Sequence, residues 1–331
     1  KLFKPRDAKL FKPRNSLGNT GGQFYVAKNP TYGAVFTYHL KDVPKTSKSK
    51  RIQSERKLNS DKKDIPFPGY KALSDEMNEK PASIILTIKD SNGNLINNVK
   101  KNASNGSGRI AWNLRHKSYY PIRSGSFRGG WGWSPSGPYA TPGDYQAELF
   151  LENNGSIEKL DGPINFSVKP LREGTLKGAS YDEYNRFRER VSELYINISK
   201  YEDVFSMIGN KIQLLEKASM QLESFSPDII AKISDFKDRY NDYEYENDSS
   251  PARDEIGEWY KPNLGARIRI AMQGLSTSYG PTELNSSNLE IAEKHFVKMK
   301  NEIEQLNKEV KDLENEVKQL NPPYIIGQGI D

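Results

Sequence analysis

The densest group of side chains suited to binding chemistry lies in a loop rich in glycine and proline. Residues 126–139 read Ser-Phe-Arg-Gly-Gly-Trp-Gly-Trp-Ser-Pro-Ser-Gly-Pro-Tyr. The candidate contact residues in it are Phe127, Arg128, Trp131, Trp133 and Tyr139. Flat aromatic rings on a loop can stack on sugar rings or anchor a protein interface. A loop folded back onto its own protein uses the same rings for packing, so packing, a protein contact and a glycan contact all remain open.

Residue types that support covalent or metal chemistry are scarce. The 331-residue chain has no cysteine, which excludes disulfides, thiolate metal sites and a cysteine nucleophile. Its three histidines, His39, His116 and His295, are scattered and have no acid or serine partner that the sequence identifies. Most of the 43 acidic residues are expected on helix exteriors or in charge-mixed loops, where they form ion pairs rather than a carboxylate pair for glycoside hydrolysis. We therefore expect no catalytic, metal or cofactor site in this chain.

The charge is concentrated at the N-terminal end. Residues 1–80 hold 18 Lys and Arg against 8 Asp and Glu, a net charge of +10, which leaves −4 for the rest of a chain whose total is +6. The basic segment has no recognised sequence-specific nucleic-acid-binding motif. Its charge supports only weak, nonspecific attraction to nucleic acid, so no specific nucleic-acid partner is expected. No run of residues approaches the ~18 apolar residues of a membrane span, so none is predicted.

The N-terminal segment predicts an extended basic strap. Lys-Leu-Phe-Lys-Pro-Arg occurs at residues 1–6 and again at 9–14, and its prolines favour extended backbone. The aromatic and β-branched run at 32–40 predicts a strand. The polar stretch 41–63 has few apolar groups, which indicates an exposed, mobile loop that is either solvated or contacts an anionic partner. We expect residues 1–40 to lie on another part of the protein rather than form a free tail.

Residues 81–172 alternate with a period of two. Strands are predicted at 83–89, 108–114, 143–151 and 164–168, with turns at Asn92-Gly93 and Asn153-Asn154-Gly155. Several short strands separated by turns predict a small antiparallel immunoglobulin or fibronectin III-like β-sandwich. Trp112 is expected to be buried between its sheets, whereas the tryptophans of the aromatic loop are expected to make contacts.

The C-terminal half changes to a helical period. Apolar residues spaced three and four apart predict two long coiled-coil-like helices over 184–215 and 289–320. Capping boxes are expected at Ser180 with Glu183 and at Ser287 with Glu290. With shorter helices between them, residues 180–321 predict an antiparallel helical bundle, followed by a tail at 322–331. The two long helices are expected to pair antiparallel.

Several short motifs occur in an order that resembles the C-terminal region of bacterial sortilin-like BNR-repeat β-propeller proteins, which are often labelled glycosyl hydrolases. The motifs are Leu10-Phe-Lys-Pro-Arg14, Asn29–Lys41, Gly108–Arg115, Pro142–Tyr145, Val168–Leu171 and Ala271–Tyr279. The resemblance implies export to the periplasm or cell surface. The propeller itself is missing from this sequence, since neither the signature Ser-x-Asp-x-Gly-x-x-Trp nor a repeat of ~40 residues occurs.

The resemblance and the residues together predict a role. We expect a noncatalytic C-terminal assembly and interaction region, secreted or on the cell surface, that docks on a protein partner or on its own propeller. The alternative is a glycan-binding accessory module of a surface glycoside hydrolase. Any hydrolase activity would belong to a propeller, and because the sequence opens on Lys1 inside its repeat, we expect it to be a processed product or part of a longer polypeptide.

Overall fold

The fold is seen in a computed structural model of the chain, which describes residues 1–13, 27, 29–122, 136–172, 174, 176–247, 251–258 and 261–327. The chain divides into two compact units. The first, here called the sheet unit, is Lys1–Ser118 with Ser134–Lys177. The second, the helical unit, is Tyr119–Trp133 with Gly178–Asp331.

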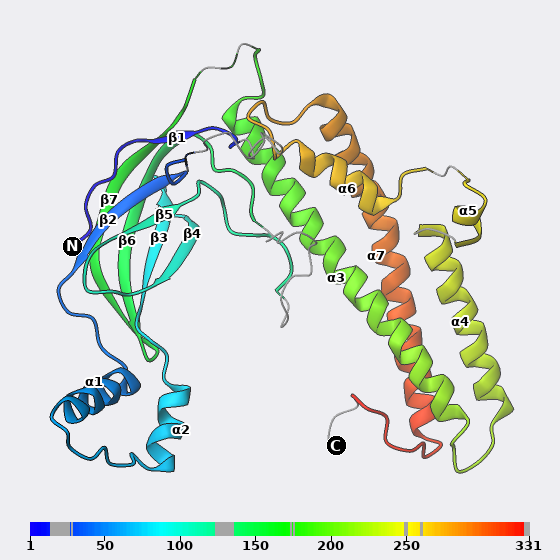
Figure 1. Ribbon diagram of the computed structural model, residues 1–331. Coiled ribbons are helices and arrows are strands. Elements are labelled where there is room, and N and C mark those ends of the chain that lie inside the picture. Colours follow the sequence, from blue (N-terminus) through cyan, green and yellow to red (C-terminus); the bar gives the residue numbers. More distant parts are fainter. Residues whose placement is uncertain are drawn as a thin grey trace. The chain divides into compact units, whose positions relative to one another are not determined.

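The sheet unit contains two sheets and a pair of helices (Figure 1). Its elements are β1 (Ala8–Leu10), β2 (Ala34–Leu40), α1 (Ser47–Ser60), α2 (Tyr70–Asn78), β3 (Ser83–Asp90), β4 (Leu95–Asn102), β5 (Gly106–Trp112), β6 (Gly143–Asn153) and β7 (Ser156–Pro170). Among the described residues, five strands form one curled sheet in the order β1-β7-β6-β3-β4, and β2 pairs with β5 in a second sheet. The strand β1 runs parallel to β7, whereas the other pairs are antiparallel.

Two tight turns connect neighbouring strands where the sequence predicts them. Gly93 between β3 and β4 has φ 84°. Between β6 and β7, Asn154 and Gly155 have φ 50° and 83°. Asn154 and Gly155 form a two-residue hairpin turn with positive φ at both positions, which matches the right-handed twist of its strands. The β3–β4 connection is the four residues 91–94, in which Gly93 adopts the positive φ. Both predicted turns are confirmed.

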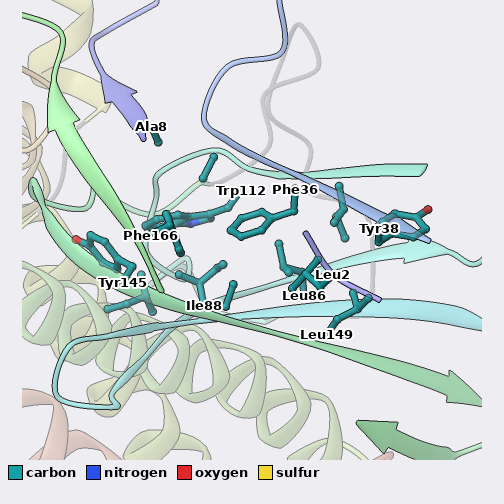
Figure 2. Packing of buried hydrophobic residues seen from close by; sticks show 14 of the residues in the cluster. Leu2, Ala8, Phe36, Tyr38, Leu86, Ile88, Trp112, Tyr145, Leu149 and Phe166 are labelled. Carbon is teal, nitrogen blue, oxygen red and sulfur yellow. The ribbon is translucent and has the colours of Figure 1, made fainter. Parts of the chain in front are cut away.

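Alternate side chains from both sheets enter one shared core. Phe36 and Trp112 from the two-stranded sheet pack with Tyr145 and Phe166 from the five-stranded sheet (Figure 2). The Trp112 ring centroid lies 5.1 Å from that of Tyr145 and 6.1 Å from that of Phe166. The predicted burial of Trp112 is confirmed, because its side chain is fully buried.

The predicted immunoglobulin or fibronectin III-like sandwich is wrong. The larger sheet is mixed and curled into a half-barrel, and the N-terminal segment supplies a strand to each sheet. Alternation decides which side chains face the core, but it does not identify the neighbouring strand. The sequence pattern therefore located most of the strands without the pairing that decides the fold.

The N-terminal segment lies on the sheet unit. The amide of Phe3 donates to the carbonyl of Thr37 at 2.9 Å, and Leu2 forms a β-bridge with Tyr38. Ala8 pairs in parallel register with Val168. The prediction that this segment is not a free tail is confirmed for its described residues.

The stretch 41–63, predicted as a loop, instead contains helix α1. Its N-cap is Thr46, whose side chain accepts a hydrogen bond from the Ser49 amide at 3.1 Å. The Arg51 guanidinium donates to Glu55 on the next turn at 2.6 Å. Capping and i,i+4 pairs supported a helix that the scarcity of apolar residues had argued against.

The helical unit begins with a capping box at Ser180 and Glu183, as predicted. Its elements are α3 (Tyr181–Ser219), α4 (Pro227–Asn247), α5 (Pro251–Glu255), α6 (Leu264–Gln273) and α7 (Glu283–Lys318). The helix α7 begins one turn earlier than the sequence indicated, because Thr282 and Asn285 form its capping box. The predicted box at Ser287 and Glu290 lies inside this helix.

The two long helices run parallel, so the predicted antiparallel pairing is wrong. In three separate places, a side chain of α3 contacts a side chain of α7 whose residue number is 103 higher. These contacts are Arg190 with Glu293, Tyr201 with Glu304 and Lys211 with Glu314. A constant difference in residue number requires both helices to point the same way. The intervening helices return the chain to the end where α3 begins, and α7 starts from there (Figure 1).

The predicted bundle with two coiled-coil-like helices is also wrong, since each end of the α3–α7 pair is completed by a third helix. Ile208 and Ile303 belong to a core cluster that includes Ile233 of α4. Leu194 and Leu289 belong to another cluster, which includes residues of α6. Together with α1 and α2, the described residues contain seven helices. The apolar seams therefore serve three-helix packing instead of a two-stranded coil.

Candidate functional site

Only one of the five predicted contact residues falls within the described part of the chain. Phe127, Arg128, Trp131 and Trp133 lie outside the described residues. Tyr139 belongs to the sheet unit and forms a β-bridge with Arg115. The Arg115 guanidinium carbon lies 3.8 Å from the centroid of the Tyr139 ring. This cation–π contact covers one face of the ring, so that face is not available to stack on a sugar.

The surroundings of Tyr139 are those of a packed cluster. The Arg115 side chain donates to the Gly137 carbonyl at 2.9 Å, while its own carbonyl accepts from the Trp112 indole at 2.8 Å. Burial is the main factor that raises the pKa of nearby Tyr32 to about 12, and the neighbouring Tyr139 raises it further. Tyr139 therefore helps to close the sheet unit over Trp112.

The histidines do not converge on one site. His39 Nδ1 lies 3.1 Å from Ser107 Oγ on the exposed side of the β2–β5 pair, a contact that depends on the strand register and was not visible in the sequence. His295 lies on α7. Within the described ranges, no group of three or more His, Asp or Glu is placed to hold a metal ion. The same part of the chain contains no helix long and apolar enough to cross a membrane.

The first candidate binding surface is the pair of helices inserted between β2 and β3, here called the helical arm (residues 47–78). All residues of α1 and α2 are described, and none is buried. Four large apolar side chains on the arm are exposed by about half or more. They are Ile65 (49%), Phe67 (64%), Tyr70 (84%) and Met77 (87%). Solvent, rather than the rest of the sheet unit, surrounds this apolar edge.

Polar contacts hold the arm in one shape. Arg51 of α1 donates two hydrogen bonds of 2.8 Å to the carboxylate of Glu76 on α2. This pairing lowers the pKa of Glu76 below its ordinary value. Glu79, at the end of α2, accepts from the Ser47 amide at the start of α1 at 2.6 Å. A bidentate guanidinium–carboxylate pair orients two helices as well as joining them.

The second candidate surface is a cleft of about 1030 Å³ in the helical unit, here called the helical cleft. Side chains of α3, α4, α6 and α7 line it, together with Arg253 of α5, Tyr120 and the turn that precedes α6. Aromatic rings form much of its lining. Phe205 lies 4.9 Å from Tyr243, and Tyr120 lies 5.1 Å from Tyr195, measured between ring centroids. Burial raises the pKa of both Tyr120 and Tyr243.

Charges of opposite sign line different helices of the cleft. The residues from α3 and α4 include the acids Glu202, Glu244 and Glu246. The residues from α6, α7 and the turn before α6 include the cations Lys261, Arg269, Lys294 and Lys298. Each of these looks in the sequence like a solvated residue on a helix exterior. Because they come from segments far apart in the chain, only the packing of the helices brings them to one cleft.

No family model, curated protein or solved structure matches the chain.

Proposed function

We propose that this chain is a noncatalytic interaction region that binds a protein partner through the helical arm. Following the motif resemblance, the partner is either another exported protein or a sortilin-like propeller of the same polypeptide. The observation that carries the proposal is the exposure of Tyr70 and Met77 on α2 and of Phe67 in the connection from α1, in an arm whose helices bury none of their own residues.

The arm has the properties of a prepared contact surface. Tyr70 and Met77 are seven residues apart, so they lie on one face of α2 two turns from each other. Phe67 extends this face, because its ring packs edge-on against Tyr70 at 5.1 Å. Covering apolar surface stabilises a complex by roughly 25 cal/mol per Å². Since the Arg51–Glu76 clamp already orders the arm, little further conformational entropy is lost on binding.

The charge of the arm indicates the chemistry of the partner. The arm contains eight Lys and Arg against five Asp and Glu, a net charge of +3, and residues 47–63 hold seven of those cations against two acids. An interface with an apolar centre and a basic surround is complemented by an acidic rim on the other protein. We therefore expect an apolar patch bordered by Asp and Glu on the partner.

The positions of the motifs that resemble sortilin-like proteins support a shared domain with those proteins rather than a shared activity. The motif at 29–41 forms β2 and the motif at 108–115 forms β5, and these strands pair along their full length. Leu10 pairs with Pro170, and Gly143 pairs with Val168, so three more motifs meet in the larger sheet. Motifs that meet in strand pairing specify a fold, and fold alone does not assign chemistry.

Photocrosslinking in cells that express the protein tests the proposal. A photoreactive phenylalanine at position 70 or 77 should yield one discrete protein adduct. The same group at Ile157, which is 63% exposed on β7, is the matched control and should not. Equal adducts at all three positions, or none at 70 and 77, would refute docking through the arm. Recovery of the adduct from the cytoplasmic fraction would refute export while leaving docking intact.

A further inference from the structure

We propose that the helical cleft is a second docking site, which binds one amphipathic α-helix of a protein partner whose two flanks carry opposite charge. The helical arm belongs to the sheet unit and the cleft to the helical unit. The two sites therefore share no residues, and either proposal can fail without the other.

The size of the cleft suits a helix. A helix with its side chains is at least ~10 Å across, so a volume of about 1030 Å³ holds ~13 Å of it, or ~9 residues. Pockets for single small ligands usually have volumes of ~300 to 1,000 Å³ and bury most of the ligand. The helical cleft lies at the upper limit of that range. A segment of two to three helical turns is thus the occupant of matching dimensions.

The apolar part of the lining can receive the apolar stripe of such a helix. It includes Ile198 and Phe205 from α3, Met272 from α6 and Met299 from α7. Methionine side chains adapt to different partners, and helices that bind grooves insert residues spaced three and four apart. Apolar side chains from several helices of the cleft can therefore contact the apolar stripe of one bound helix.

Within the described part of the chain, three cations of the cleft lack a partner, whereas Lys298 of the cleft pairs with Glu302 and Arg253 pairs with Glu258. Outside the cleft, Arg190 pairs with Glu293 and Arg239 pairs with Glu309. Among the described residues, no hydrogen bond or ion pair is found for Lys261, Arg269 or Lys294. The N-terminal turn of α6 also borders the cleft and adds the positive end of a helix dipole. This part of the lining selects acidic side chains.

The acidic part of the lining selects cations. It consists of Glu244 and Glu246 from α4 and Glu202 from α3. A helix with glutamates on one flank and lysines on the other satisfies both parts of the lining, whereas a uniformly charged helix is repelled by one of them. Charge complementarity thus favours a helix of mixed charge over a small anion.

A designed peptide tests the proposal. The probe is a fluorescent helix of about 15 residues with one leucine stripe, glutamates on one flank and lysines on the other. Its affinity for the whole chain is measured by fluorescence anisotropy at low salt. The double variant Lys294→Glu, Lys298→Glu should bind it about five- to tenfold more weakly, since two exposed ion pairs with the peptide's glutamates are replaced by like-charge contacts. A peptide with lysines on both flanks should show the reverse preference.

Two controls make the result specific. The variant Lys308→Glu, Lys311→Glu changes two exposed lysines of α7 that do not line the cleft and should bind like the unmodified chain. The arm variant Tyr70→Ser, Met77→Ser should also leave peptide affinity unchanged. Three results would overturn the proposal: no saturable binding, equal binding of a peptide with scattered leucines, or full displacement by laurate, which would make the cleft a site for a small amphipathic anion.

Discussion

Replacing Trp112 with alanine should destabilise the sheet unit by about 3 to 5 kcal/mol. The side chain is fully buried and packs against Tyr145 and Phe166 from the opposite sheet. Truncation of a buried Trp to Ala removes its transfer free energy and leaves a cavity, which together cost about 3 to 5 kcal/mol. The lost hydrogen bond from the indole to the Arg115 carbonyl, 2.8 Å long, places the expected value toward the upper end.

Native-state hydrogen exchange measures this cost within the sheet unit alone. The slowest amides of β3 and β6 report its largest opening free energy, which should fall by the stated amount in Trp112→Ala. Trp131→Ala and Trp133→Ala are the controls, and each is expected to have a much smaller effect. A loss below about 1 kcal/mol at Trp112 would refute the account of the core. An equal loss at all three positions would show that the aromatic loop is part of the core.

Three further predictions concern single contacts. Ile303→Asp should place an unpaired charge in the α3–α4–α7 core and unfold the helical unit, while limited proteolysis still finds the sheet unit intact. Glu148→Gln should lower the free energy of unfolding by about 1 to 2 kcal/mol at pH 7. Hydrogen bonds from Lys159 and then Lys89 hold the pKa of Glu148 below its usual 4.5. The stabilisation is therefore present above pH 4.5 and is lost as the pH falls through the lowered pKa. Chemical denaturation should show the unfolding free energies of variant and parent converging at that low pH. Ser180→Ala removes the capping box of α3 and should cost about 1 kcal/mol in thermal unfolding.

Local signals in the sequence predicted parts of the sheet unit well. The strand predicted at 83–89 is β3, and both Asn-Gly turns form where expected. The pairing of β1 with β7 could not be predicted in this way, because it joins residues about 160 positions apart and nothing in an alternating pattern names the partner strand. That pairing converts the expected antiparallel sandwich into a mixed half-barrel.

The same limit applies to the helical unit and to both candidate sites. The spacing of apolar residues predicted two long helices, but their relative direction depends on how the segment between them returns. The helical arm was missed because α1 buries nothing, so it lacks the apolar period by which helices are recognised. The helical cleft was missed because its residues come from several helices on which each looks solvated.

The central claim is that a partner protein covers the helical arm. Hydrogen exchange of residues 70–78, compared between the purified chain and the assembly isolated from cells, tests it most directly. In the purified chain these amides should exchange rapidly, because α2 buries no residue. In the assembly they should be protected by a further factor of about ten or more, equivalent to ~1.4 kcal/mol of added local stability. Unchanged exchange at 70–78 in an assembly that is protected elsewhere would contradict the claim.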